Sequence, residues 1–191
     1  MSRQGQAFRF EKDPAVQQCR LLIDGYNLLF ALGWTPARRP GPSDSEVTLR
    51  QCRERLSAEL ARRLPGAMVG KSVIVYDSAN SRNGLPVHQY SRGTHLYFSI
   101  AYNSADEALQ EILQYHPSPK QLVLISSDHA VQRKATARGA RCIESEDWED
   151  AIELFRDGES SINVETDVEL EIKTQAIQAD EREEWLRRFG F

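Results

Sequence analysis

Hydrophobic residues along the chain alternate between short continuous runs and longer stretches of helical spacing. The continuous runs lie at residues 20–24, 72–76, 95–101, 122–127 and 140–143. An apolar run of this length, bounded by turn residues, predicts a strand buried on both faces of a sheet. Apolar residues three or four apart, with charges between them, lie at residues 44–64, 104–115, 129–138 and 148–155. This spacing predicts helices, and strands that alternate with helices predict a parallel sheet covered on both faces.

The segments outside this alternation predict a leader, two loops and a tail. Residues 1–18 are polar and show no period, which predicts a loose leader. Residues 36–43 hold three prolines, and residues 78–94 are rich in Ser, Asn, Gly and Arg, so both predict exposed loops. We therefore expect one domain over residues 19–156, followed by an acidic extension over 157–191. The extension alternates polar and apolar residues at first and ends in a stretch that resembles a short helix.

Composition narrows the class of protein. A chain of 191 residues, 40% of them hydrophobic, can form one well-buried domain. No apolar run approaches the roughly 18 residues of a membrane span, and the first residues are too polar for a secretory signal. Three widely spaced cysteines, Cys19, Cys52 and Cys142, predict reduced thiols and not a zinc or disulfide framework. We expect a cytoplasmic protein without a membrane partner.

Charge is distributed unevenly along the chain. Residues 1–143 carry 19 Lys and Arg against 12 Asp and Glu, a net charge of +7, and residues 144–191 carry a net charge of -11. A basic body is compatible with a nucleic-acid partner, whose binding an acidic tail would temper or direct. The same tail is equally compatible with a role in solubility alone.

Aspartates occupy comparable places in four of the predicted strand–helix units. Asp24, Asp77 and Asp128 each follow an apolar strand, and Asp106 lies in the first turn of a helix. Because a parallel sheet brings the carboxyl ends of its strands to one edge, we expect these side chains to converge there. Converging carboxylates repel one another unless a cation neutralises them. The pattern therefore predicts a Mg²⁺ or Mn²⁺ site of the kind that hydrolyses phosphodiesters.

Each acid also has a purely structural interpretation. Asp24 and Asn27 could only cap the following helix, and Asp128 could do the same for the next one. Asp106 lies where a helix dipole favours a negative charge. Recurrence at four comparable places nevertheless favours a shared site over four independent caps.

The same residues resemble a known family. Four segments carry the resemblance, in order and at suitable spacing: Leu22-Ile23-Asp24-Gly25-Tyr26-Asn27, Val75-Tyr76-Asp77, Ser104-Ala105-Asp106-Glu107 and Ser126-Ser127-Asp128. They are similar to the signature of the YacP-like NYN domains, which belong to the PIN-like nuclease superfamily. The resemblance covers residues 19–156, and the Asp-Gly-Tyr-Asn and Ala-Asp-Glu elements are its most specific parts.

The resemblance implies a three-layer α/β/α sandwich with a mostly parallel central sheet and a metal-dependent endoribonuclease site. For some relatives it also implies cleavage of messenger RNA on the ribosome. Carried over by position, Asp24 would be the central Mg²⁺ or Mn²⁺ ligand, with Asp106 and Asp128 as flanking ligands. Asn27 would orient Asp24 or the scissile phosphate, and Asp77 would complete the catalytic group at the second strand end.

Contacts to single-stranded RNA are expected from polar residues in the loops and helix beside these acids. The candidates are Arg38, Arg39, Arg82, Asn83, His88, Arg92, Arg133 and Lys134. Such residues would neutralise phosphates, which positions a strand without selecting its sequence. Tyr26 and Tyr90 are candidates for stacking on bases. The arginines of the 44–64 helix are assigned to its solvated face.

Two further classes of protein remain open. One is a non-catalytic RNA- or ribosome-binding protein with the same fold, although an idle site has no reason to keep mutually repelling acids. The other is a different doubly wound domain, such as a receiver or a nucleotide-binding domain. This alternative ranks last because the chain has no glycine-rich phosphate-binding motif.

Overall fold

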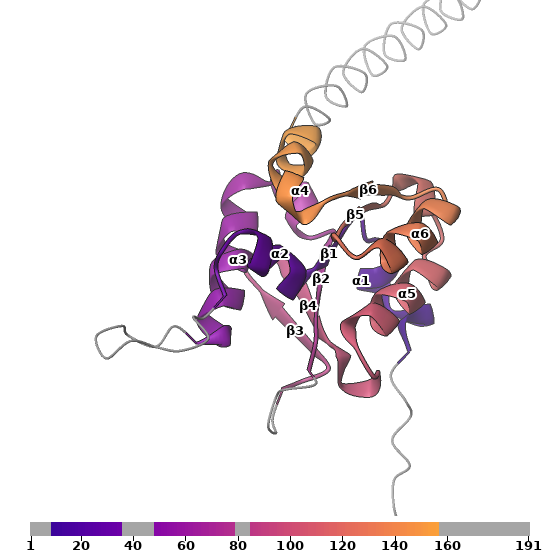
Figure 1. Cartoon of the computed structure of the whole chain (residues 1–191), viewed down its shortest axis with the longest axis horizontal. Coiled ribbons are helices and arrows are strands. Elements are labelled where there is room, and N and C mark those ends of the chain that lie inside the picture. Colours follow the sequence, from indigo (N-terminus) through magenta and orange to yellow (C-terminus); the bar gives the residue numbers. More distant parts are fainter. Residues whose placement is uncertain (1–8, 36–47, 79–84, 157–191) are drawn as a thin grey trace, which may run out of the picture. The chain divides into compact units, whose positions relative to one another are not determined.

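The computed structural model describes residues 9–35, 48–78 and 85–156, and these form an α/β domain around a six-stranded sheet (Figure 1). The strands are β1 (Leu21–Asp24), β2 (Ser72–Tyr76), β3 (His88–Ser91), β4 (Thr94–Phe98), β5 (Val123–Ile125) and β6 (Arg141–Ile143). Their order across the sheet is β3-β4-β2-β1-β5-β6, and all neighbours are parallel except β3 and β4. The predicted mostly parallel α/β fold is confirmed.

Helices cover both faces of this sheet, as Figure 1 shows. One face packs against η1 (Phe10–Lys12), α1 (Pro14–Gln17), α5 (Ala105–Tyr115) and α6 (His129–Ala137). The other packs against α2 (Gly25–Ala31) and α3 (Leu49–Arg63). The remaining short helices are α4 (Gly66–Val69), η2 (Ser99–Ala101), η3 (Pro119–Gln121) and η4 (Ser145–Asp147), and residues 148–156 are also helical.

The central strands are buried because helices cover them on both sides. All residues of β1 and β2 are buried, which explains their continuous apolar character. Tight packing extends to the turn after β1, where α2 begins at once. A Cβ built on Gly25 would lie 2.3 Å from Cε1 of Tyr76 and 2.8 Å from Cγ2 of Ile74. Only glycine allows this close approach of α2 to β2.

The segment predicted as a long loop over residues 78–94 contains a strand. β3 pairs antiparallel with β4 through a two-residue turn at Arg92 and Gly93, whose φ angles are 50° and 90°. Positive φ at both positions is typical of the hairpin turns that match strand twist. β3 lies at the sheet edge and is mostly exposed, so it lacks the apolar run that marks the other strands. The predicted strand at 95–101 ends at Phe98 and continues as η2.

The predicted loose leader over residues 1–18 is folded against the domain in the part that the structure describes. Asp13 caps α1 by accepting a hydrogen bond from the backbone of Ala15, and Pro14 occupies the first helical position. Phe10 and Val16 are buried in the core against the α5 face of the sheet. Two isolated apolar residues give no period, so the pattern could not reveal that they are buried. Residues 1–8 lie outside the described part.

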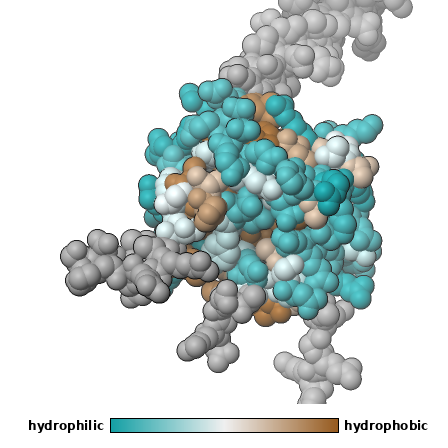
Figure 2. Space-filling model, in the orientation of Figure 1, coloured by the Kyte–Doolittle hydropathy of each residue, from teal (hydrophilic) through white to brown (hydrophobic). Residues whose placement is uncertain are grey.

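The surface is mainly hydrophilic on the face that Figure 2 presents, with small separate hydrophobic areas. The exposed large apolar side chains of the described residues are Phe30, Leu49, Tyr90 and Ile100. Single exposed apolar residues are ordinary on a folded domain. Within the described residues, no helix combines the length and the apolar character that crossing a membrane requires.

Candidate active site

Asp24 lies at the carboxyl end of the central strand β1. β1 pairs with β2 on one side and β5 on the other, so Asp24 emerges between the loops that follow both neighbours. Its side chain is only 7% exposed. Oδ1 accepts a hydrogen bond from the backbone N–H of Asn27 at 3.2 Å, which caps α2, and Oδ2 accepts one from Ser126 Oγ at 3.3 Å.

Burial and neighbouring acids together raise the pKa of Asp24 from 3.8 to about 6. Burial has the largest effect, and the charges of Asp106 and Asp128 add to it. The hydrogen bonds from Asn27 and Ser126 act in the opposite direction, since they favour the ionised form. A carboxyl group whose pKa is raised this far by burial and by neighbouring acids is typical of functional sites.

The other three predicted aspartates lie within electrostatic reach of this edge. Asp106, in the first turn of α5, is half-buried, and burial together with the charges of Asp128 and Asp77 raises its pKa. Asp128 caps α6, and its Oδ1 accepts hydrogen bonds from two backbone N–H groups. Asp77 follows β2, and its Oδ1 accepts a hydrogen bond from Ser99 at 3.3 Å. The structure thus gathers the four carboxylates at one edge while using two of them as caps.

These carboxylates do not form a ready-made three-ligand metal site. In the part of the chain that the structure describes, no three His, Cys, Asp or Glu side chains are grouped so that they could hold a metal ion. The donor chemistry nevertheless fits a hard divalent cation, because Asp24 and Asp106 are carboxylates that are partly buried among other negative charges. Mg²⁺ is usually bound through one or two carboxylates, with waters and substrate phosphates as its other ligands. Such a cation requires fewer protein ligands than the predicted Asp24, Asp106 and Asp128 set.

Asn27 has a different set of contacts from the one that the sequence predicts. Its Oδ1 accepts hydrogen bonds from the backbone N–H of Ser127 at 3.0 Å and from Ser145 Oγ at 2.5 Å. The side chain therefore connects α2 to the loop that carries Asp128 and to η4. Only the backbone of Asn27 bonds to Asp24 among the described contacts.

Ser126 is a site residue that the sequence analysis does not single out. It is fully buried, and its Oγ donates to Asp24 while accepting from the backbone N–H of Asp128 at 3.1 Å. One hydroxyl group therefore links the end of β1 to the cap of α6. The signal in the sequence is the polar pair that separates an apolar strand from Asp128, but such a pair is equally typical of an ordinary turn.

The predicted RNA-binding residues are only partly brought to this edge. Arg38, Arg39, Arg82 and Asn83 lie outside the described residues. His88 is exposed, and its Nε2 lies 3.0 Å from Nδ1 of His95 on the face of the hairpin that packs toward η1. Arg92 lies in the β3–β4 turn beside the start of β2, at the opposite end of the sheet from the aspartates. The structure therefore does not place Arg92 beside the acids.

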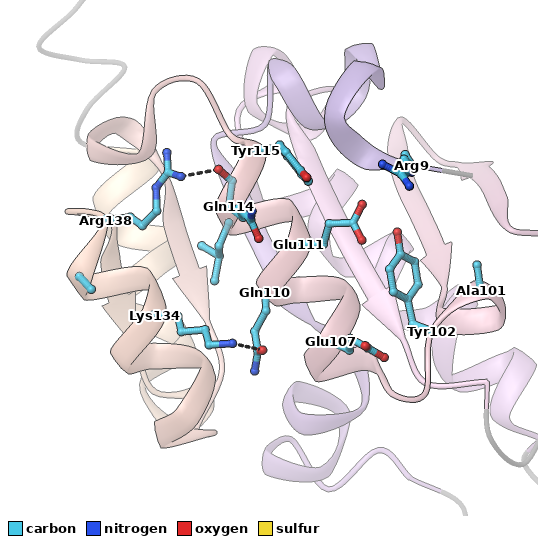
Figure 3. Close-up of a pocket in the computed structure, with 12 residues that line it drawn as sticks. Arg9, Ala101, Tyr102, Glu107, Gln110, Glu111, Gln114, Tyr115, Lys134 and Arg138 are labelled. Atoms are coloured by element: carbon cyan, nitrogen blue, oxygen red, sulfur yellow. Dashed lines mark hydrogen bonds between the residues drawn. The ribbon is translucent and has the colours of Figure 1, made fainter. Parts of the chain in front are cut away.

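The two predicted cations on α6 have separate surroundings. Arg133 is exposed. Lys134 turns toward α5, where its Nζ donates a hydrogen bond to Gln110 Oε1 (Figure 3). Both residues of this pair line a pocket of about 710 Å³ between α5 and α6, together with Glu107, Glu111 and Arg138. This pocket lies along the outer side of α5 and does not include the four aspartates.

The two tyrosines predicted to stack on bases differ in exposure. Tyr90 is 60% exposed and makes an edge contact with the ring of His95. Tyr26 is half-buried, with its ring centroid 5.0 Å from that of Tyr76. Its hydroxyl accepts a hydrogen bond from Nη1 of Arg53 at 2.8 Å. The sequence predicts Arg53 on the solvated face of its helix, but the structure places it against Tyr26 and Tyr76.

Comparison with known proteins gives one family. No curated protein matches the chain. Two crystal structures of Rae1 (YacP) from Bacillus subtilis, the second of a mutant, are similar to it at 20% and 18% sequence identity, with TM-scores of 0.48 and 0.47. They cover 89% and 71% of this chain, which in turn covers 94% and 76% of theirs. The sequence profile of the YacP-like NYN domain matches residues 21–189 and so continues through most of the acidic extension, and the chain belongs to this family.

Proposed function

We propose that this protein is a metal-dependent endoribonuclease that cleaves single-stranded RNA. The observation that carries the proposal is the convergence of four carboxylates at the carboxyl edge of the sheet, where Asp24 is buried and its pKa is raised to about 6. Carboxylates that converge in this way repel one another unless a cation neutralises them, so their convergence supports a cation-binding site. Membership of a PIN-like family of domains agrees with nuclease chemistry.

The residues divide into ligands and positioning groups. Asp24 and Asp106 would hold Mg²⁺ or Mn²⁺, with Asp128 as the third carboxylate and Asp77 as a further charge at the edge. The cation, when bound, would lower the pKa of water for attack on the phosphodiester and neutralise the charge that develops there. Ser126 and Asn27 fix the relative positions of the strand end and the α6 loop.

Messenger RNA on the ribosome is the physiological substrate that the family suggests, and we propose a cytoplasmic location accordingly. The competing function is a non-catalytic RNA- or ribosome-binding protein. One observation favours that alternative, namely that the described residues hold no preassembled three-ligand metal group. The two functions differ in what happens to the RNA once metal is supplied.

The deciding experiment compares wild type with Asp24→Asn on a labelled single-stranded RNA, each with Mn²⁺, with Mg²⁺ and with EDTA. We expect wild type to cleave internally only when metal is present. Loss of the Asp24 carboxylate should reduce the rate by at least about 100-fold, because it removes the central charge of the site. Glu153→Gln removes an exposed carboxylate outside this group and should leave cleavage unchanged.

The same comparison on translating ribosomes covers an enzyme that requires the ribosome to present its RNA. Metal-dependent cleavage there that is absent with Asp24→Asn would support the nuclease. Intact RNA in both settings, together with measurable RNA binding, would refute the nuclease and favour the binding protein.

A further inference from the structure

Arg53 lies in an unusual position for an arginine of an amphipathic helix. It projects from the second turn of α3 toward the sheet, and its side chain is half-buried. Its guanidinium carbon lies 5.2 Å from the ring centroid of Phe98 and 5.8 Å from that of Tyr76. These contacts hold the guanidinium against the rings of Tyr76 and Phe98, at the ends of β2 and β4, and against the hydroxyl of Tyr26 in α2.

The charge of Arg53 is not matched by an acid among the residues that the structure describes. Three other arginines of α3 pair with carboxylates, namely Arg50 with Glu54, Arg62 with Glu59 and Arg63 with Glu149, and the guanidinium of Arg55 lies over the ring of Trp34. Arg53 instead makes one hydrogen bond to a neutral hydroxyl and two contacts to aromatic rings. A half-buried guanidinium with donors left over is suited to binding an anion, and its planar geometry matches phosphate oxygens.

Arg53 also forms one wall of a pocket between α3 and the β3–β4 hairpin. The pocket has a volume of about 300 Å³ and is lined by Arg50, Arg53, Glu54, Leu85, Pro86, Gln89, Ser91 and Leu96. Gln89 lies directly opposite Leu96 in the β-ladder, so both side chains are on the face of the hairpin that meets α3. The pocket thus combines the Arg53 guanidinium, the Arg50–Glu54 ion pair, apolar surface and an amide group that can donate and accept hydrogen bonds.

This combination corresponds to the parts of one nucleotide. A phosphate fits the guanidinium of Arg53, a base fits the apolar surface of Leu85, Pro86 and Leu96, and the amide of Gln89 can bond to a base edge. Arg53 also connects this pocket to the carboxylate edge. Its hydrogen-bond partner Tyr26 follows Asp24 by two residues, and Tyr76, whose ring it contacts, directly precedes Asp77.

We propose that the pocket lined by Arg53, Gln89 and Leu96 binds one nucleotide of the single-stranded RNA. Arg53 holds the phosphate of that nucleotide and Gln89 contacts its base. The inference rests on the proposed RNA substrate, and it assigns part of the binding surface to α3 and the edge hairpin. Tyr26 keeps the guanidinium oriented and so couples this subsite to the turn after Asp24.

The test is equilibrium binding of a fluorescein-labelled oligouridylate in EDTA, where cleavage cannot occur, at several salt concentrations. Arg53→Gln should weaken binding by about tenfold, because a charge-assisted hydrogen bond to phosphate is lost. It should also reduce the salt dependence of binding by about one counterion. Gln89→Glu, which places a negative charge in the pocket, should weaken binding to a similar extent.

Two control variants make the same changes in charge elsewhere. Arg62→Gln lies on α3 with an exposed side chain, and Gln18→Glu is exposed near the opposite end of the sheet. Both should bind RNA within about twofold of wild type, since exposed charges are screened. Melting curves identify a variant that fails to fold. If Arg53→Gln does fail, Gln89→Glu on the exposed edge strand decides the question.

The outcomes separate this inference from the proposed function. Binding by Arg53→Gln and Gln89→Glu that matches the controls would overturn the nucleotide pocket, as would a wild-type protein that binds no RNA. Binding that depends on Arg53, together with no cleavage in any metal on free RNA or on translating ribosomes, would refute the nuclease and leave the nucleotide pocket standing.

Discussion

Asp24 combines a structural and a chemical role at a single residue. As the cap of α2 it accepts a backbone hydrogen bond, and a cap stabilises a helix. As a buried carboxyl group near Asp106 and Asp128 it resists ionisation, so that its pKa rises to about 6. Above this pKa the capping hydrogen bond still raises the free energy of unfolding, whereas the charge on the buried carboxylate lowers it.

The pH dependence of stability should therefore show the effect of Asp24 in metal-free protein. The folded state binds this proton more tightly than the unfolded chain, so the stabilisation is complete below pH 3.8 and is lost as pH rises through about 6. The difference of about two pKa units corresponds to about 3 kcal/mol. Asn also caps helices well, so Asp24→Asn keeps the cap and removes the titration.

We expect Asp24→Asn to become more stable relative to wild type by about 3 kcal/mol between about pH 4 and about pH 7. Urea denaturation in EDTA at several pH values measures this difference. Glu153→Gln, which removes an exposed carboxylate, should show a flat difference over the same range. A flat difference for Asp24→Asn as well would show that Asp24 ionises without hindrance in the folded protein.

At the scale of elements, Asn27 joins three segments that are distant in sequence. Its Oδ1 accepts hydrogen bonds from the backbone N–H of Ser127 after β5 and from the hydroxyl of Ser145 in η4, which is 118 residues away. Ser145 is 1% exposed, so its hydroxyl cannot turn to bulk water if this acceptor is removed. The loop that carries Asp128 therefore depends on a side chain from the first helix after β1.

Asn27→Ala should lower the free energy of unfolding by about 1–3 kcal/mol, because it leaves two donors without an acceptor. Ser145→Ala alone should cost less, and the double variant should cost less than the sum of the two, since the unsatisfied hydroxyl is then absent. Urea denaturation of the four proteins measures the cycle. Asn103→Ala makes the same change at an exposed site and should cost no more than about 0.5 kcal/mol. Strictly additive effects of the two substitutions on the free energy of unfolding would show that Asn27 and Ser145 do not interact.

The sequence predicts the part of the site that follows from strand topology. Aspartates after β1, β2 and β5 converge because parallel strands share a carboxyl edge, and this needs no knowledge of side-chain packing. The Arg53–Tyr26 contact joins residues 27 positions apart on two helices, and the periodicity of α3 cannot distinguish an arginine that folds back over the sheet from one in solvent. The sequence does not predict β3 for a related reason, because an exposed edge strand carries no apolar run.

At the scale of the whole domain, the segment before β1 is part of the core. The ring of Phe10 lies edge-on to Tyr97 of β4, with ring centroids 5.3 Å apart, and stacks on Tyr102 at 5.4 Å. Tyr102 precedes α5, whose first turn carries Asp106. Phe10 therefore packs η1 against the face of the sheet that α5 covers, and it belongs to the same cluster of buried residues as Leu109 and Leu124.

Phe10→Ala should accordingly destabilise the domain by about 3–5 kcal/mol, the usual cost of removing a buried aromatic ring and leaving a cavity. Such a loss is a large fraction of the 5–15 kcal/mol that typically stabilises a domain. Urea denaturation measures it, with Phe30→Ala as the matched control, because Phe30 is 75% exposed and its removal should cost no more than about 0.5 kcal/mol. Equal effects of the two substitutions would mean that residues before β1 are a leader after all. A large effect of Phe10→Ala alone would place the beginning of the folded domain before residue 19.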